Sequence, residues 1–389
     1  DGFKNLLKAD DTAGQIRFKM LAVCVGSEPR MDVVVENLLQ ELADGRDEKI
    51  RLLGRSGLDG FLWKQMTHCY GYKSDEPSIR DFSIELFKSC YANGTDGQVK
   101  LSGDAIVFLR RWKDSRQFEG GFEILSDECA EVLGIEQDLD KRDFRELIEM
   151  DYFRLIDLKI ICDLVKAAAL RTVSCSDVSL WVRQRRQSHW YGEYCHMYEA
   201  VHFAAQFIHG LGEAKLTMES LTEGVQHYSR FWYKLDQLYR KFTYHVCMSG
   251  QAALMGSLTE QIENLYSNNY LLKLGDRFQD FVDTAPKWEA LPVRKQKEFF
   301  EHWVRPFLRK DKKVCVIISD AMRYEIGDEL LSLIRQEDRY SAELEPALSM
   351  LPSYTQLGMA ALLPNKELAI ADNETGTVLV GGQSSQGTA

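Results

Sequence analysis

Two residues in the last quarter of the chain have the types and spacing that a metal-activated nucleophile requires. Asp320 follows a run of β-branched and apolar residues, 314–319, and Thr355 follows a strand-like segment, 343–348, and a Pro-Ser pair. Because ligands bind at the carboxyl ends of strands in open α/β sheets, a carboxylate and a hydroxyl at two such ends are expected to lie at one site. A metal on the carboxylate would activate the hydroxyl, which is otherwise a weak nucleophile. The alternative for Asp320 is a turn residue or a helix N-cap.

Three neighbouring residues are candidates for supporting roles at this site. Arg323 falls in the helical pattern after Asp320, where we expect it to brace that carboxylate or to contact a phosphate. Glu325 is expected to pair with Arg323 or to bind metal weakly. Ser353 is the competing hydroxyl, and we expect it to cap the helix that Thr355 opens.

The elements that would position these residues are a parallel sheet and the helices that follow its strands. Segment 314–319 has the composition of a buried parallel strand, and the residues after Asp320 and from Thr355 onward have helical periodicity. Before residue 300 the chain is predicted to be mostly helical, including helices over 77–91, 142–170 and 192–210. The fold class is therefore mixed α/β, with a mostly α-helical N-terminal region followed by an α/β domain.

Domain boundaries are weakly marked in this sequence. We predict an N-terminal region over 1–100, mixed or helical, a helical region over 101–300, and the α/β domain from 301 to 389. In the first region, LAVCV fits a short strand or a buried helix equally well. The Ser176-Asp177 pair is expected at the N-cap of a later helix.

The composition indicates a cytoplasmic protein. Hydrophobic residues make up 45% of the 389 residues, yet no apolar run approaches the roughly 20 residues that span a bilayer. The nine cysteines are scattered without a C-x-x-C pair, which favours buried free thiols in a reducing compartment. No membrane association is expected.

The net charge of −11 disfavours non-specific binding of the whole chain to a phosphate backbone. Three local clusters of basic residues remain, and the cluster at 183–186 is interleaved with aromatic residues, as on single-strand-binding surfaces. We favour solvated helix faces for these clusters, because this is how charge runs usually behave. The clusters are at 110–116, 183–186 and 305–313.

The residues around both candidate positions carry a resemblance to a known family. ISDAMRYE and LPSYTQLGMAALLP resemble the PglZ family of BREX phage-defence proteins, a branch of the alkaline phosphatase superfamily. The resemblance extends loosely over residues 229–389 and implies that the α/β domain is the first part of an alkaline phosphatase-like domain. By motif, Asp320 matches the metal-binding aspartate, and Thr355 matches the nucleophile, which is also a metal ligand. The implied metal is zinc, with manganese or magnesium as alternatives.

The resemblance also implies a function for the intact protein. It would be a metal-dependent phosphoester hydrolase, acting on phosphodiesters and on nucleic acid as a candidate substrate, in BREX phage defence. Implied partners are other BREX proteins, such as BrxB or the PglX methyltransferase, and DNA. The alternative is a non-catalytic scaffold that docks other defence components through its helical region.

The remaining ligands of such a site are missing from the sequence after Thr355. No histidine follows His302, and the later carboxylates are only Glu367, Asp372 and Glu374. The superfamily places further aspartate and histidine ligands well downstream of the nucleophile. We therefore expect this chain to be a fragment with an incomplete site and no activity of its own.

Overall fold

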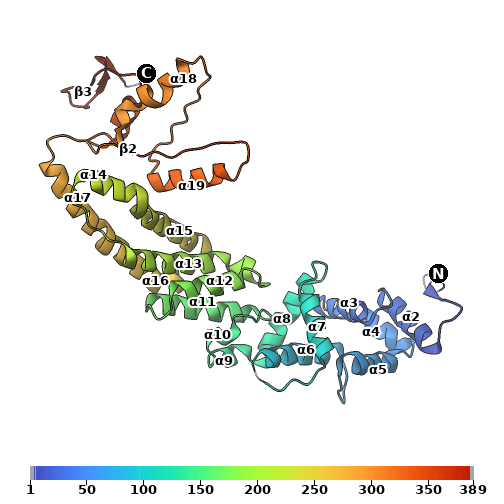
Figure 1. Cartoon of the computed structure of the whole chain (residues 1–389). Helices are drawn as coiled ribbons and strands as arrows, with labels where there is room; N and C mark the ends of the chain where they lie inside the picture. The colour runs from blue at the N-terminus through green and yellow to red at the C-terminus, as the bar shows by residue number, and fades with distance from the viewer. Residues whose placement is uncertain (1–3, 5, 96, 386–389) are drawn as a thin grey trace. The chain divides into compact units, whose positions relative to one another are not determined.

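Helices dominate the fold. The computed structural model describes residues 4, 6–95 and 97–385, with its elements labelled in Figure 1. Contacts divide the chain into two compact units, one of residues 1–202 and Val246–Ser257, the other of Phe203–His245 and residues 258–389. Each unit is described by itself. The mixed α/β class and the mostly helical N-terminal region are confirmed, whereas the division at residues 100 and 300 stays a prediction.

The first unit is a succession of helices around an aromatic core. The fully buried Phe87 lies with its ring centroid 6.1 Å from Trp112, 5.6 Å from Phe122 and 5.5 Å from Phe153, so three helices and the start of a fourth meet at one ring. Burying such large rings is the main source of stability for this packing. The helices are α2 (Ala13–Val25), α3 (Met31–Ala43), α4 (Glu48–Arg55), α5 (Asp59–Tyr70), α6 (Ile79–Gly94), α7 (Gly103–Lys113), α8 (Glu119–Leu133), α9 (Ile135–Leu139), α10 (Phe144–Leu147), α11 (Arg154–Ala169), α12 (Cys175–Arg185) and the first part of α13 (Tyr191–Glu213).

A buried ion pair joins three of these helices. The Arg185 Nη2 atom lies 2.6 Å from Asp157 Oδ2, and the Tyr198 hydroxyl donates to Asp157 Oδ1 at 2.6 Å. Arg185 also donates to the main-chain oxygens of Ile148 and Met150, at 3.0 and 2.7 Å. Buried charges are tolerated only when they are paired and hydrogen-bonded in this way.

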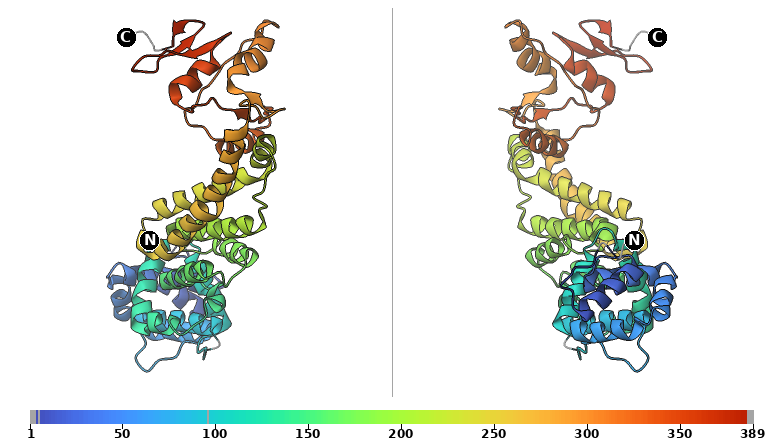
Figure 2. Two further views of the ribbon diagram at one scale, coloured as in Figure 1. Left: turned by 90° about the vertical axis from the view of Figure 1, so that its left-hand side faces the viewer. Right: turned by 90° about the vertical axis from the view of Figure 1, so that its right-hand side faces the viewer.

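The second unit combines a helical part with short strands. The strands β1 and β2 pair in parallel, and β3, β4 and β5 form an antiparallel sheet in that order. Figure 2 shows this small sheet beside α20. The elements are α14 (Leu221–His227), the π-helical turn η1 (Tyr228–Trp232), α15 (Tyr233–Ser249), α16 (Ala252–Asn264), the π-helical turn η2 (Leu265–Leu271), α17 (Leu272–Thr284), β1 (Arg294–Lys295), η3 (Gln296–Glu298), η4 (Phe300–Val304), α18 (Arg305–Leu308), α19 (Tyr324–Arg335), β2 (Ala347–Leu348), α20 (Thr355–Leu362), β3 (Leu368–Ile370), β4 (Val378–Val380) and β5 (Gln383–Ser384).

Tyrosines on the two π-helical turns enclose a buried carboxylate. Asp236 accepts hydrogen bonds from Tyr228 at 2.7 Å, Tyr266 at 2.8 Å and Tyr270 at 3.4 Å. Burial and the charge of Asp236 raise the pKa of all three phenols. The tyrosines therefore remain protonated donors, which satisfies the buried charge and fixes α15 against both turns.

Two of the three predicted helices are present, and the third is divided into two. Helices over 77–91 and 192–210 are confirmed as α6 and α13, and LAVCV lies in the helix α2. The single helix over 142–170 was wrong, because α10 and α11 are separate and the backbone between them accepts hydrogen bonds from Arg185. The N-cap of α12 is Ser174, whose hydroxyl accepts from the Asp177 N–H at 3.1 Å, so the predicted cap was two residues late.

The predicted strand over 314–319 was wrong. These residues form no strand, and the Ile317 side chain is 89% exposed. Of segment 343–348 only β2 is a strand, paired with β1. A strand needs neighbouring strands to satisfy its N–H and C=O groups, and within the described residues no strand pairs with 314–319. An apolar run alone does not supply them.

Candidate active site

The Thr355 hydroxyl stands at the first residue of α20. Its N-cap is Tyr354, which has an extended backbone and makes no side-chain cap, so the N–H groups of the first turn are not used by a capping side chain. A helix start of this kind favours a bound anion. The expectation that Ser353 caps this helix was wrong, because the helix begins one residue too late for it.

The packing of α20 fixes the position of Thr355. Leu357 and Ala360 form a small buried cluster with Val378 of β4, and Gln296 donates to the Gly358 carbonyl at 3.2 Å. The small and apolar residues of α20 lie on one face of the helix, and this face packs against the sheet. The rotation of the helix about its axis is therefore fixed. Thr355 lies exposed at the end of that rigid support.

Asp320 lies in an exposed turn and not at the end of a strand. Its Oδ1 atom accepts the N–H of Ala321 at 2.9 Å, and Ala321 has a φ of 54°. A left-handed backbone is uncommon for a residue other than glycine, and such conformations cluster at functional sites. Asp320 is thus a turn residue, which was the alternative to a metal ligand at a strand end. The left-handed backbone of Ala321 keeps a functional role for this turn as a hypothesis.

Arg323 and Glu325 lie at the start of α19. Arg323 is the N-cap of this helix, and its Nη2 atom lies 3.3 Å from Glu325 Oε1. Glu325 is fully buried and receives the Nε group of Arg240 at 3.1 and 2.9 Å on its two oxygens. Because two guanidinium groups occupy this carboxylate, Glu325 is poorly placed to bind a metal.

Further contacts hold α19 against α15. Gln237 donates to the Glu325 carbonyl at 3.2 Å, and the rings of Tyr324 and Tyr233 meet edge to face with centroids 5.2 Å apart. Glu329 forms ion pairs with Arg240 and Lys241. The helix after Asp320 is therefore supported by α15, whereas Thr355 is supported by the small sheet.

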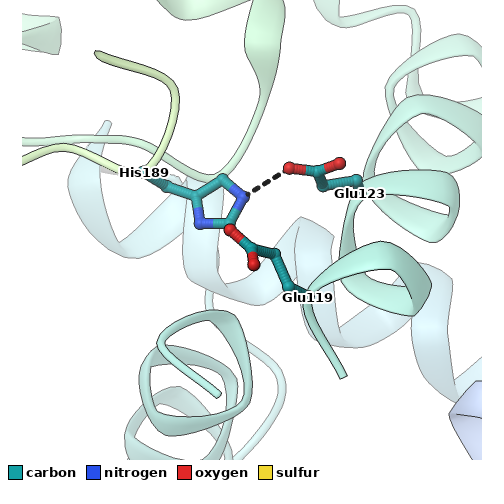
Figure 3. A group of neighbouring side chains, drawn as sticks. All are labelled: Glu119, Glu123 and His189. Atoms are coloured by element: carbon teal, nitrogen blue, oxygen red, sulfur yellow. Dashed lines mark hydrogen bonds and ion pairs between the residues drawn. The ribbon is translucent and has the colours of Figure 1, made fainter. Parts of the chain in front are cut away.

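Asp320 and Thr355 are not joined by any hydrogen bond within the described residues. In that same part of the chain, the group of side chains with the spacing of metal ligands is Glu119, Glu123 and His189 (Figure 3). It lies in the first unit. Within the described residues, Asp320 belongs to no group of three side chains with the spacing of metal ligands, so a metal bound there would need further ligands.

The sequence reasoning missed this group of three residues. Glu119 and Glu123 are four positions apart on α8, a spacing that places both on one helix face, but His189 follows Glu123 by 66 residues. The sequence indicates that the two glutamates share a helix face. It does not indicate which distant histidine packs beside them.

Several residues of the basic clusters form ion pairs. Arg185 is buried against Asp157, Arg186 pairs with Glu199 at 2.7 Å, and Arg111 pairs with Asp32 and Glu36. Paired guanidinium groups release few counterions from a nucleic acid. This pairing supports the interpretation of 183–186 as a helix face, which stays a prediction.

A mixed α/β region follows the helical one in this chain. Residues 299–389 match the family model described as the BREX system PglZ alkaline phosphatase-like domain. This match and two curated relatives support the resemblance to the PglZ family of BREX proteins, and the C-terminal part of the chain is alkaline phosphatase-like.

Two curated relatives resemble nearly the whole chain. It is 28% identical over 426 residues to the alkaline phosphatase-like protein BrxZ of Escherichia coli O9:H4 (strain HS), covering 99% of this chain and 48% of that protein. It is 25% identical over 386 residues to the alkaline phosphatase-like protein PglZ of Bacillus cereus (strain H3081.97), covering 95% and 45%. The chain spans about half the length of these relatives. No solved structure matches it.

Among the described residues, no helix combines the length and apolar character needed to cross a bilayer.

Proposed function

We propose that the complete protein is a metal-dependent phosphoester hydrolase of a BREX phage-defence system, with phosphodiesters as its substrates and nucleic acid as the candidate target. Thr355 is the nucleophile and Asp320 a metal ligand. The observation that carries this proposal is the position of Thr355. Its hydroxyl opens an uncapped helix within the part of the chain that matches the alkaline phosphatase-like family.

The chemistry follows from that position. Attack by the Thr355 hydroxyl requires loss of its proton, formation of a bond to phosphorus and departure of the ester oxygen, after which water releases the phosphate. The N–H groups at the start of α20 would hold the non-bridging oxygens as their charge grows. A divalent cation, zinc with manganese or magnesium as alternatives, would supply a lower pKa for the hydroxyl and charge neutralisation.

The setting proposed for this activity comes from the family. The matching domain is described as part of the BREX system, which supports other BREX proteins as partners. Within that class we propose BrxB or the PglX methyltransferase, and DNA as a further partner. The absence of a membrane-spanning helix among the described residues is compatible with a cytoplasmic location.

A non-catalytic scaffold is the second candidate. It is favoured by the buried pairing of Glu325 with Arg240 and by the lack of a third ligand near Asp320 within the described residues. In that case the helical region would dock other defence components, and the alkaline phosphatase-like part would be organisational.

Hydrolysis of a chromogenic phosphodiester by the full-length protein separates these candidates. With zinc or manganese present, Thr355→Ala is expected to reduce turnover by at least about 10³-fold, because the covalent route is removed. Thr243→Ala is the matched control, since that hydroxyl bonds only to the Tyr239 carbonyl on α15. Full activity in Thr355→Ala, or its loss in Ser353→Ala instead, contradicts the assignment, and no activity in the unmodified protein favours the scaffold.

A further inference from the structure

A histidine and two glutamates converge in the first unit, away from the residues assigned to hydrolysis. Glu119 and Glu123 lie one turn apart at the start of α8, and His189 lies in the short connection between α12 and α13. One ligand atom from each side chain lies within 4.8 Å of the other two. Figure 3 shows both carboxyl groups turned toward the imidazole ring, whose Nε2 atom is 3.1 Å from Glu123 Oε1.

The imidazole is held in place by its surroundings. Its side chain is only 6% exposed, with the Phe122 ring centroid at 5.0 Å and the Trp190 centroid at 4.7 Å, both edge to face. The main-chain N–H of His189 donates to the Asp151 carboxylate at 3.0 Å, and the Lys113 ammonium group pairs with the same carboxylate at 2.8 Å. A buried ring fixed by packing and by a main-chain bond is what a preorganised ligand requires.

An ion pair between His189 and Glu123 explains only part of this arrangement. It leaves the Glu119 carboxylate facing a second carboxylate across one imidazole, although Glu119 is exposed and has no hydrogen bond or ion pair to any described residue that would hold it there. Two carboxylates that share a site repel each other unless a cation lies between them. Glu119 is therefore the group whose position the ion pair does not explain.

We propose that Glu119, Glu123 and His189 bind a divalent transition-metal ion of the zinc type. Metal–ligand bonds of about 2.0–2.2 Å place two ligands of one ion roughly 3–4.4 Å apart, so side-chain shifts of about half an ångström bring all three atoms into range. An imidazole with two carboxylates suits zinc better than calcium or magnesium, which take oxygen ligands. The ion would connect α8 to the start of α13 and stabilise the first unit.

Calorimetric titration of the full chain with Zn²⁺ tests this proposal. An Asp320→Asn background removes the proposed hydrolytic metal ligand, so that binding at the two places is separated. We expect one zinc ion bound in this background and a rise in the thermal unfolding midpoint. Glu119→Gln should weaken zinc binding by about tenfold or more and remove the rise, while leaving the metal-free protein as stable as before, because Glu119 has no partner to lose.

Glu131→Gln on the same helix is the matched control and should bind zinc like the parent protein, since Glu131 is exposed at the far end of α8. Co²⁺ in place of zinc gives visible absorption bands that report nitrogen and oxygen ligands, and His189→Gln should change them. Absence of zinc binding, equal binding by Glu119→Gln and Glu131→Gln, or equal affinity for Mg²⁺ overturns the proposal. None of these results bears on the role of Thr355.

Discussion

At the scale of single residues, the same side-chain type has different fates in this protein because its surroundings differ. Asp157 is fully buried and receives hydrogen bonds from Arg185 and Tyr198, whereas Asp320 is exposed and bonds only to the next N–H group among the described residues. The first arrangement stabilises the fold, and the second leaves a carboxylate available to a ligand. For these two aspartates, burial and not residue type decides whether the carboxylate has a structural role or is open to a ligand.

Asp157→Ala is expected to lower the free energy of unfolding by about 3–5 kcal/mol, because it leaves the buried Arg185 guanidinium without its counter-charge. Urea denaturation followed by circular dichroism measures the change. Asp163→Ala on the same helix is the control, since its pair with Lys159, one turn away, is partly exposed and is worth about 0–1 kcal/mol. An equal decrease in the free energy of unfolding in the two variants would contradict a larger contribution of the buried pair.

At the scale of elements, α19, the helix that follows Asp320, forms ion pairs with α15. Partial burial opposes ionisation of Glu329, but the hydrogen bond from Arg240 and the charges of Lys241 and Arg240 outweigh it and hold the pKa of Glu329 below its ordinary value of 4.5. A lowered folded-state pKa means that this carboxylate stabilises the folded protein above about pH 4.5. The contribution is lost as the pH falls through the folded value.

Glu329→Gln should therefore destabilise the protein at pH 7 by about 0.5–1 kcal/mol, a modest effect because the side chain is one-third exposed. The difference from the parent protein should shrink between pH 7 and pH 3, because Glu329 takes up a proton as the pH falls through its lowered folded-state pKa. Urea midpoints at the two pH values measure it. Glu337→Gln, exposed beyond the end of α19, should show no difference at either pH, and a Glu329→Gln deficit as large at pH 3 as at pH 7 would contradict the assignment.

At the scale of the whole chain, all nine cysteines are free thiols, as their spacing predicted. Burial raises the pKa of the Cys90 thiol to about 12, and burial, against a hydrogen bond with Ser83, raises that of Cys129 to about 11. Cys247 and Cys315 are exposed, so the expected burial of the thiols was wrong for these two residues. Since the thiolate is the reactive form, accessibility and pKa together predict a wide spread of reaction rates.

In the native protein, Cys247 and Cys315 should react first with a chromogenic disulfide reagent, and Cys90 and Cys129 only after unfolding in urea, where nine thiols are expected in total. Cys315→Ser should remove one rapidly reacting thiol, with Cys129→Ser as the control that leaves the rapid phase unchanged. Slow reaction at Cys315 would show that segment 314–319 is covered in solution, contrary to its exposure in the structure.

Local features were predictable because they depend on near neighbours in the chain. The periodicity of α6 and α13, the start of α20 at Thr355 and the free thiols all follow from residue types a few positions apart. The motifs around Asp320 and Thr355 also indicated the PglZ family, which the comparisons support. The roles of those two residues stay predictions.

The sequence by itself thus determined the helical character of the chain, the resemblance to the PglZ family and the candidate residues Asp320 and Thr355. Only the tertiary structure decided that 314–319 forms no strand, that Arg240 occupies Glu325, and that His189 meets Glu119 and Glu123. The physical reason is the same in each case. Strand pairing, buried ion pairs and ligand clusters depend on residues tens of positions apart, and no local pattern specifies which distant partner packing will supply.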